Sequence, residues 1–366
     1  MSDISFQMKK AVRMQKGSCH TGRLPKGCAL CEKGAKMVLL VTGKCDRHCF
    51  YCPLSNEKRG RDVFFANERR IKDAGEAVDE GRLMDALGTG VTGGDPLQNI
   101  ERTVASIKTL KKAFGETHHI HLYTTQADAG KIRRLAKAGL DEIRFHPPLA
   151  KWSKLSATPY KKAAALSKRL GLATGLELPA IPGEEEGLVS AIRFADESAL
   201  DFVNLNELEF SETNWQALRK LDFDVRDDVS SGVKGSERLG RDLLSLDTDV
   251  PLHYCSAAFK DGIQLRRRIM RRARNVKRPH EILTKDGTFI KGIIETDDLS
   301  MTAAWLLNKY SVPGNLIRAD GPRMRLEIAP WILEEIAGEL DMPSYIIEEY
   351  PTADRLEVER IPLRRR

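Results

Sequence analysis

Three closely spaced cysteines near the start of the chain have the residue type and spacing of iron ligands. Cys45, Cys49 and Cys52 are separated by three and two residues. Three thiolates in one short loop can hold three irons of a [4Fe–4S] cube and leave the fourth iron open to a non-protein ligand, whereas a closed structural site takes four protein ligands. The spacing therefore predicts a reactive iron–sulfur cluster. A zinc site that lacks one ligand is the alternative.

The remaining cysteines could form a second metal site. They are Cys19, Cys28, Cys31 and Cys255. An odd total of seven cysteines, six of them within residues 19–52, does not suggest disulfides, and clustered thiolates in a reducing compartment usually bind metal. Four thiolates would close a site for zinc or a second iron–sulfur cluster. The pairing with Cys255 is an inference. His20 and His253 are alternative ligands, and Cys255 could instead be a small buried apolar side chain.

Strand and helix patterns alternate through the first two thirds of the chain. Predicted strands lie at residues 37–43, 88–96, 119–124, 142–146, 174–178 and 202–208. Predicted helices lie at residues 67–85, 100–114, 127–138, 160–170 and 185–198. Six strands separated by helices imply parallel pairing through right-handed crossovers, and so an α/β fold with a partial parallel (β/α)6 barrel. The cysteine loop follows the first strand, at the end of the barrel where active sites form.

The cysteine loop KCDRHCFYCPL resembles the radical SAM superfamily. It carries that family's C-x3-C-x2-C signature with an aromatic residue, Tyr51, before the last cysteine, and the resemblance extends from Val38 to about Leu208. It implies that S-adenosylmethionine chelates the open iron and that an external donor of flavodoxin or ferredoxin type supplies one electron. The resemblance further implies cleavage to methionine and a 5′-deoxyadenosyl radical, which abstracts hydrogen from a substrate.

The same resemblance implies a site for S-adenosylmethionine at the strand ends. In VTGGDP, Gly93 and Gly94 would let the backbone approach the methionyl amine, and Asp95, where the family more often has Glu, would help to fix it. Thr124, Thr125, Arg144 and His146 occupy positions that in relatives reach the methionyl carboxylate and ribose; polar caps on a barrel are the alternative. By strand position, further residues point to the same mouth: Glu177, Asn204, Asn206 and Glu207.

Two further segments resemble a mainly archaeal group of radical SAM proteins related to glycyl-radical (pyruvate formate-lyase) activating enzymes. They are GCALCEKGAKMVLLVTG, which contains Cys28 and Cys31, and HYCSAAFKDGIQLRRR, which contains Cys255. This resemblance implies no particular substrate.

The sequence pattern changes after Ser211. A polar stretch at residues 222–238 is predicted to contain a linker, and a strand is predicted at residues 251–255. The rest reads as a small α+β domain. Its predicted elements are a hairpin at 281–295, helices at 299–309 and 330–340, and hairpin turns at 319–322 and 352–354. The predicted domains are a Cys-rich metal-binding segment (1–35), the barrel (36–260), and a basic helix with the α+β domain (261–366).

Charge and hydropathy limit the class of protein and its partners. With 41% hydrophobic and 30% charged residues, the chain is too apolar for disorder and too charged for a membrane protein. No apolar run approaches the roughly 18 residues of a spanning helix, and the first residues do not read as a secretory signal, so we expect a cytoplasmic protein without a membrane partner. The net charge of +7 is concentrated in residues 266–278, which hold eight cations and no acid.

The basic segment at residues 266–278 is the feature that distinguishes the possible substrates. Its cations predict contact with RNA phosphates, and the alternative is a packed helix whose arginines are solvated or paired. The leading hypothesis is therefore a radical SAM enzyme that acts on a macromolecule, with RNA favoured. A second hypothesis is modification of a protein or peptide, including glycyl-radical formation. The third is a non-catalytic iron–sulfur or zinc protein that binds RNA.

Overall fold

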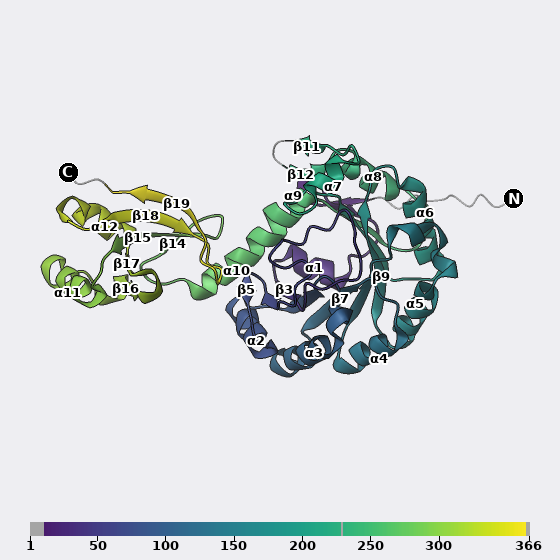
Figure 1. Cartoon of the computed structure of the whole chain (residues 1–366), viewed down its shortest axis with the longest axis horizontal. Coiled ribbons are helices and arrows are strands. Elements are labelled where there is room, and N and C mark those ends of the chain that lie inside the picture. The colour runs from purple at the N-terminus through teal and green to yellow at the C-terminus, as the bar shows by residue number, and fades with distance from the viewer. Residues whose placement is uncertain (1–10, 228–229, 364–366) are drawn as a thin grey trace. The chain divides into compact units, whose positions relative to one another are not determined.

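The computed structural model describes residues 11–227 and 230–363, and it divides into two compact units. The first unit contains the described residues up to Leu265 except Leu83–Asp85, and the second contains Leu83–Asp85 together with the described residues from Arg266 onward. Figure 1 shows the chain coloured along its length.

Seven parallel strands form the first unit's main sheet, one more than the sequence predicted. In spatial order they are β3 (Lys36–Leu40), β6 (Gly88–Thr92), β7 (His119–Thr124), β8 (Glu142–Phe145), β9 (Ala173–Ala180), β10 (Phe202–Glu207) and β13 (Leu252–Cys255). The seventh strand, β13, pairs with β10 so that Cys255 lies opposite Asn206. Residues 251–255 were predicted as a strand but not as part of the barrel, because nothing in a short strand's own sequence identifies its neighbour.

Short antiparallel strands extend both edges of this sheet. Beyond β3 lie β4 (Phe65–Ala66) and β5 (Arg69–Arg70), and beyond β13 lie β2 (Cys19–His20) and β1 (Val12–Arg13). The prediction of a helix from residue 67 is wrong in its first half. The chain instead turns at Asn67, whose φ is 52°, into the β4–β5 hairpin, and α2 covers only Ala74–Leu83.

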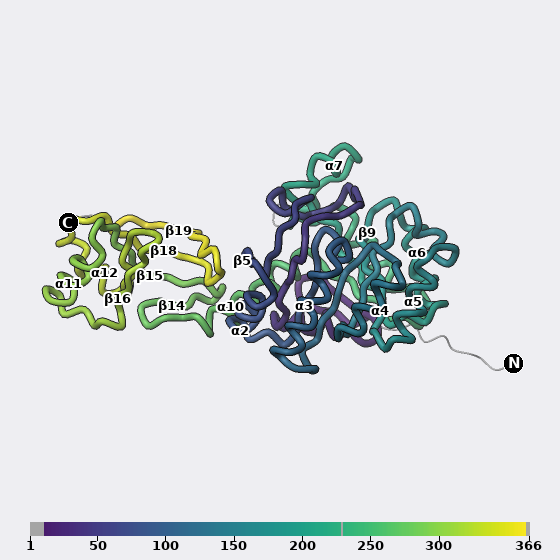
Figure 2. Tube along the Cα trace, turned by 60° about the horizontal axis from the view of Figure 1, so that its bottom comes forward, coloured from purple at the N-terminus to yellow at the C-terminus, as the bar shows by residue number. Residues whose placement is uncertain are grey.

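The outer helices agree with the predicted ones to within two residues. They are α3 (Ile100–Phe114), α4 (Ala129–Ala138), α5 (Pro159–Arg169) and α6 (Glu185–Glu197). Polar caps explain where these helices begin: Asn99 accepts from the amide of Arg102, and Asp128 from that of Lys131. In Figure 2 these helices follow one another along the outside of the first unit.

One helix lies inside the ring of strands. Figure 1 shows α1 (Lys26–Glu32) in the middle of the barrel. A Cβ atom on Gly27 would lie 2.4 Å from His121 Nδ1 and 2.5 Å from Arg144 Nη2, so only glycine fits at this contact. The amide of Gly27 donates to Glu142 Oε2 at 3.2 Å. The helix therefore closes the amino-terminal half of the barrel interior.

The predicted linker at residues 222–238 is wrong for the part of it that the structure describes. That part forms β11 (Val225–Asp227), β12 (Ser230–Val233) and the start of α8 (Ser236–Leu243), all within the first unit. Asp228 and Val229 lie outside the described residues. The polar composition of residues 222–238 reflects the largely exposed strand β11, which pairs with β12 and which was predicted as part of a linker. Smaller elements of this unit are α7 (Trp215–Arg219), α9 (Ala257–Phe259) and a π-helical turn at Lys260–Leu265.

The second unit is an antiparallel sheet with three helices. Its sheet has the order β16 (Ile317–Asp320), β17 (Arg325–Ile328), β15 (Phe289–Glu295), β18 (Ser344–Glu349) and β19 (Glu357–Pro362), and β14 (Ile282–Leu283) also pairs with β15. The three predicted hairpins are confirmed. The helices are α10 (Arg266–Val276), α11 (Leu299–Tyr310) and α12 (Pro330–Ile336). Leu306, Leu326 and Leu333 are fully buried in its core. Across both units, the described residues include no helix with the length and apolarity to cross a membrane.

Candidate functional site

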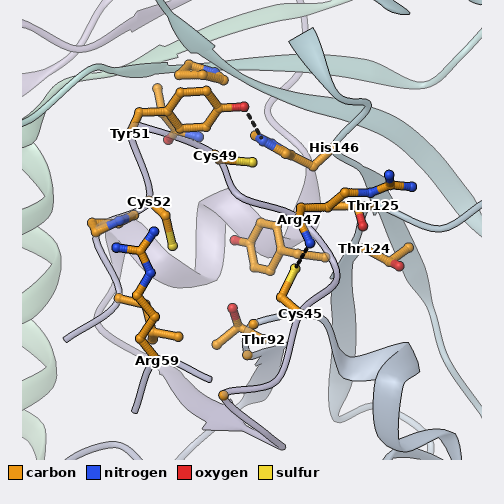
Figure 3. Close-up of a pocket in the computed structure, with 18 of the residues that line it drawn as sticks. Cys45, Arg47, Cys49, Tyr51, Cys52, Arg59, Thr92, Thr124, Thr125 and His146 are labelled. Atoms are coloured by element: carbon orange, nitrogen blue, oxygen red, sulfur yellow. Dashed lines mark hydrogen bonds between the residues drawn. The ribbon is translucent and has the colours of Figure 1, made fainter. Parts of the chain in front are cut away.

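A cavity of about 460 Å³ lies at the carboxyl ends of the parallel strands of the first unit. Figure 3 shows Cys45, Cys49 and Cys52 directed into it from one loop, with Thr124, Thr125 and His146 across from them. The structure thus brings together ten of the predicted residues. They are Cys45, Cys49, Cys52, Gly93, Gly94, Thr124, Thr125, His146, Asn206 and Glu207.

The end of β6 holds the cysteine loop through backbone contacts. The amide of Gly94 donates to Thr42 O at 2.8 Å, and that of Asp95 donates to Lys44 O at 2.9 Å. A Cβ on Gly93 would lie 2.4 Å from Thr42 O, and one on Gly94 would lie 2.3 Å from Lys44 O. The two glycines are therefore needed for the loop to dock, in addition to any contact with a ligand.

The cysteine triad fits an iron–sulfur cluster better than a single zinc ion. Four ligands around tetrahedral zinc, with Zn–S bonds of about 2.3 Å, lie about 3.8 Å apart. The Sγ atoms of Cys45, Cys49 and Cys52 do not all lie within 4.8 Å of one another. Burial raises the pKa of Cys45 and of Cys49, so these thiols carry protons until a metal displaces them. Three soft sulfur donors at wider spacing suit a cube of irons.

Asp95 orients two cavity residues and does not itself line the cavity. Its buried carboxylate accepts from Thr124 Oγ1 at 2.9 Å, Thr125 Oγ1 at 2.7 Å and the Thr125 amide at 2.9 Å. It also accepts from the amide of Leu97. With its acceptor sites committed in this way, Asp95 fixes the positions of Thr124 and Thr125, whereas the sequence predicted that it would help to fix the ligand itself.

Tyr51 and His146 form a hydrogen-bonded pair beside the cysteines. His146 Nδ1 lies 2.7 Å from Glu177 O, and because a carbonyl only accepts, Nδ1 carries the proton. The other ring nitrogen, Nε2, therefore accepts from Tyr51 Oη at 3.0 Å, as the dashed line in Figure 3 marks. Burial lowers the pKa of His146 and raises that of Tyr51. Both are neutral, and the pair anchors the aromatic residue of the cysteine loop to the barrel.

Three predicted ligand-binding residues are buried in the barrel interior and do not line the cavity. Arg144 Nη1 contacts Glu177 Oε2 at 3.0 Å, and Asn204 Nδ2 donates to the same oxygen at 2.8 Å. The buried Arg144 also bonds Glu142, which draws its side chain toward α1 and away from the strand ends. Arg144, Glu177 and Asn204 are thus absent from the cavity lining. Glu177 Oε1 accepts from Asn206, which does line it, so this carboxylate links the cavity to the interior.

Several cavity residues were missed by the sequence reasoning. Arg47 lies within the cysteine loop, and Tyr123 alternates along β7 with Leu122 and Thr124, so the motif and the strand period could have indicated both. Lys260 follows β13, and its place depends on the pairing of β13 with β10, which was not predicted from the sequence. Its Nζ lies 3.2 Å from Glu209 Oε1.

The second cysteine set separates into two places. Burial raises the pKa of Cys255, and Cys28 and Cys31 on α1 are near enough to raise it further. Cys19, by contrast, pairs with Tyr254 in the register of β2 and β13. Neighbours in a register face the same side of a sheet, so Cys19 and Cys255 face opposite sides. The predicted set of four thiolates is therefore wrong in including Cys19, which lies beside Arg241 and Glu237 of α8.

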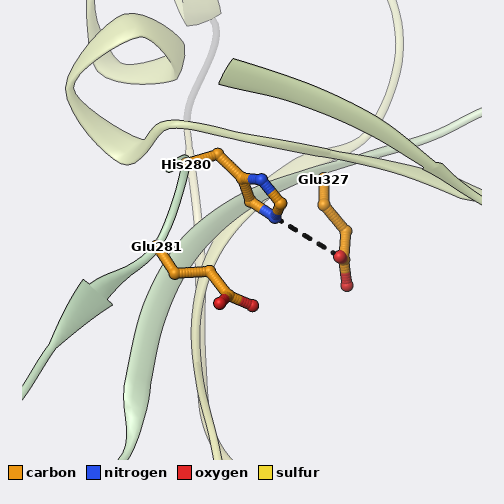
Figure 4. A group of neighbouring side chains, drawn as sticks. All are labelled: His280, Glu281 and Glu327. Carbon is orange, nitrogen blue, oxygen red and sulfur yellow. Dashed lines mark ion pairs between the residues drawn. The ribbon is translucent and has the colours of Figure 1, made fainter. Parts of the chain in front are cut away.

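The second unit contains a different group of possible ligands. In the part of the chain that the structure describes, His280, Glu281 and Glu327 place three ligand atoms within 4.8 Å of one another (Figure 4). Lys291 Nζ, however, lies 3.1 Å from both Glu281 Oε1 and Glu327 Oε1. The ammonium group already occupies the position that a cation would take.

The arginines of α10 are largely engaged with the second unit itself. Arg271 Nη2 donates to Asp85 Oδ2 at 2.7 Å, and Arg272 Nε donates to Pro351 O at 2.6 Å. Arg266 lies 3.1 Å from Asp286 Oδ1. On the same segment, Arg274 and Lys277 are exposed.

Comparisons with known proteins match both parts of the chain. Residues 287–363 match a family model described as a domain of unknown function, DUF8061. Over 362 residues, and 93% of each chain, the sequence is 40% identical to a protein of Methanocaldococcus jannaschii named "Putative glycyl-radical enzyme activating enzyme".

The solved structures found are more distant. SuiB of Streptococcus suis bound to S-adenosylmethionine is 16% identical and aligns over 61% of this chain and 50% of its own, with a TM-score of 0.41. The FeFe-hydrogenase maturase HydG of Carboxydothermus hydrogenoformans is 15% identical over 49% of this chain and 46% of its own, with a TM-score of 0.37. The chain thus spans about half the length of these structures.

Proposed function

We propose that this chain is a radical SAM enzyme that uses a [4Fe–4S] cluster to cleave S-adenosylmethionine. The chain belongs to the family of the Methanocaldococcus jannaschii protein named "Putative glycyl-radical enzyme activating enzyme", with which it shares 40% identity over 93% of each chain. The observation that carries the proposal is the position of Cys45, Cys49 and Cys52 on one wall of the strand-end cavity. A volume of about 460 Å³ is within the range of small-molecule sites, so the cavity has room for a nucleoside-sized ligand beside a cluster.

The three cysteines would hold the cluster, which supplies the electron that splits the sulfonium into methionine and a 5′-deoxyadenosyl radical. An external donor of flavodoxin or ferredoxin type would reduce the cluster.

The threonines at the end of β7 favour particular ligand groups. Thr125 Oγ1 donates its proton to Asp95, so only its lone pairs remain for a ligand. It can accept from an amine or a ribose hydroxyl but cannot donate to a carboxylate. A methionyl carboxylate would instead meet a cation, and Arg47 lines the cavity next to Cys45. Arg144, the cation that the sequence predicted for this role, is committed to Glu142 and Glu177.

The test is production of 5′-deoxyadenosine and methionine by protein that has been reconstituted and reduced without oxygen. Cys49→Ala should abolish both products because the cube loses a required ligand. Cys19→Ser is the matched control, since Cys19 faces the other side of the sheet from the barrel interior, and it should retain wild-type turnover. Undiminished product from Cys49→Ala would overturn the proposal.

RNA is the macromolecular substrate that we propose first. The support is the exposed pair Arg274 and Lys277, which the second unit leaves facing solvent. If both contact single-stranded phosphates, the double reversal Arg274→Glu, Lys277→Glu should reduce the slope of log affinity against log salt by about 1.4, at roughly 0.7 per phosphate. Arg271→Glu, at a residue paired with Asp85, should mainly lower stability.

A protein substrate is the second candidate, and the name of the relative at 40% identity favours it. An RNA affinity whose salt slope is unchanged by the Arg274 and Lys277 reversals would select this reading. Electron paramagnetic resonance of the protein with a candidate partner would then detect a glycyl radical that depends on Cys49.

A further inference from the structure

Three thiols and one imidazole face the barrel interior on the α1 side of the cavity. Cys28 and Cys31 lie three residues apart on α1 and so share one face of that helix. His253 and Cys255 alternate along β13 and face the same side of the sheet. Their neighbours in register are Asn204 and Asn206, whose side chains bond Glu177 inside the barrel. The mechanism proposed for the cavity uses none of the four.

The imidazole of His253 has an unused nitrogen. Its Nδ1 lies 3.2 Å from Asn204 Oδ1, and because an amide oxygen only accepts, Nδ1 carries the proton. Nε2 therefore presents a lone pair, and it is buried without a hydrogen-bond partner. Leaving a buried polar atom unpaired destabilises a fold. A ring whose tautomer is fixed through one nitrogen while the other stays available has the arrangement of a metal ligand.

Two of the sulfur atoms lie within hydrogen-bond reach of neighbouring side chains. Cys28 Sγ accepts from Asn204 Nδ2 at 3.2 Å and from Arg144 Nη2 at 3.4 Å. Gln264 Nε2 lies 3.6 Å from Cys255 Sγ. Hydrogen bonds and positive charge around sulfur are the features by which proteins hold and tune iron–sulfur clusters.

We propose that Cys28, Cys31, Cys255 and His253 bind a second iron–sulfur cluster, enclosed in the barrel. A single zinc ion would need four ligand atoms about 3.8 Å apart, and no three of these ligand atoms lie within 4.8 Å of one another in the described chain. The wider spacing suits a cluster. The site goes beyond the proposed cleavage of S-adenosylmethionine, because it shares no ligand with Cys45, Cys49 and Cys52.

The experiment uses the full chain with all three cavity cysteines changed to alanine, so that only the second site can hold metal. After anaerobic reconstitution with iron and sulfide, this variant should retain about four irons and four sulfides per chain, as for one cube. Adding Cys28→Ser or Cys255→Ser should remove them. Adding Cys19→Ser is the matched control and should leave the content unchanged, because Cys19 faces α8.

The outcomes that would overturn the proposal are distinct. They are one zinc ion in place of iron and sulfide, no metal at all, or an equal loss of iron from the Cys19→Ser control. A circular dichroism spectrum and a thermal melt of each variant, recorded without metal, separate loss of a ligand from loss of the fold. Failure here would leave the turnover test on Cys49 untouched, because that test depends on the other three cysteines.

His253 can be tested through the reduction potential. Replacement of cysteine by histidine as a ligand raises the potential of a cluster. In the variant without cavity cysteines, His253→Cys should therefore keep the iron and shift the midpoint potential to more negative values, whereas His253→Ala should lower the iron content. An unchanged potential and full iron content in both variants would exclude His253 as a ligand.

Discussion

The barrel interior and the sheet of the second unit both bury charged side chains, but they balance those charges differently. In the second unit, five carboxylates meet five cationic side chains. The carboxylates belong to Glu281, Asp320, Glu327, Glu349 and Glu357, and the cations are Arg278, Lys291, Arg323, Arg325 and Arg355. In the barrel, Arg144 is matched by Glu142 and Glu177 and also donates to the thiol of Cys28, while Nε2 of the nearby His253 is buried without a hydrogen-bond partner.

This difference separates a structural network from a candidate metal site. By distance alone, His280, Glu281 and Glu327 are the more compact ligand group. Their charges are already satisfied by Lys291, so a divalent ion would have to displace a buried ammonium. The barrel group is wider, and the cation beside it, Arg144, already pairs with Glu142 and Glu177. Nε2 of His253 and Nε2 of His280 are both buried without a hydrogen-bond partner, so what separates the two groups is the buried lysine that already neutralises the carboxylates of the second unit.

The largest expected effect is the loss of Lys291. Lys291→Met would leave Glu281, Glu327 and Glu349 partly uncompensated in a buried place and should cost about 3–5 kcal/mol. Lys36→Met in the barrel should cost less, because burial lowers the pKa of Lys36 to about 8 and its hydrogen-bond partners are His119 and His121. Hydrogen exchange would assign each loss to its own unit. A larger loss of stability for Lys36→Met than for Lys291→Met would contradict the proposed difference between the two units.

A smaller effect is expected from filling the contact between α1 and the barrel. Gly27→Ala would place a methyl group 2.8 Å or less from His121, Glu142 and Arg144, and overpacking of this kind costs about 1–3 kcal/mol. Gly187→Ala in α6 is the matched control, because its neighbours stand at 3.5 Å or more; the alanine should stabilise the helix by roughly 0.5–1 kcal/mol. Denaturant midpoints of the two variants compare the packing directly. Equal midpoints would mean that the barrel interior can relax around α1.

The smallest effect concerns pH, and the two units should respond in different ranges. Burial lowers the pKa of His118 in the barrel to about 4, whereas an unfolded histidine titrates near 6.5, so the unfolded state binds the proton first as the pH falls. The free energy of unfolding of the barrel should therefore fall by about 1 kcal/mol per such histidine between pH 6.5 and roughly 5.5.

The second unit should stay stable to lower pH. Burial acts to raise the pKa of Glu327, but His280, Lys291 and Arg355 hold it well below its usual value. Its contribution is therefore present above about pH 4.3, where unfolded glutamate is charged, and is lost as the pH falls further. Hydrogen exchange at pH 7, 5.5 and 4.5 measures both units. Glu327→Gln should remove the acid response, and Glu359→Gln, at an exposed residue, should retain it.

Local sequence patterns predicted those helices and strands whose boundaries are marked by residues within or next to the element. The predicted helix at 100–114 and strand at 119–124 match α3 and β7, because an apolar face with a cap at Asn99 and a terminal Gly115 marks the helix, and a buried apolar run marks the strand. The cysteine loop was placed at the cavity by the same logic, since it follows the first strand of a parallel barrel.

Contacts between residues far apart in the sequence could not be predicted from local sequence patterns. Cys19 was grouped with Cys28 because the two are close in sequence, but pairing with Tyr254 turns Cys19 to the outer face of the sheet. Arg144 sits at a strand end as predicted, and two buried carboxylates then direct its side chain inward. Such choices depend on partners tens or hundreds of residues away.

The place of α1 has a consequence for the order in which a newly made chain can fold. Residues 19–21 leave the ribosome long before β13, yet Thr21 and Leu252 exchange backbone and side-chain hydrogen bonds across 231 residues. Translation must therefore proceed beyond β13 before β2 has an edge to join and α1 has a ring to enter. The β2 and α1 segment is therefore among the last parts of this unit to find its partners.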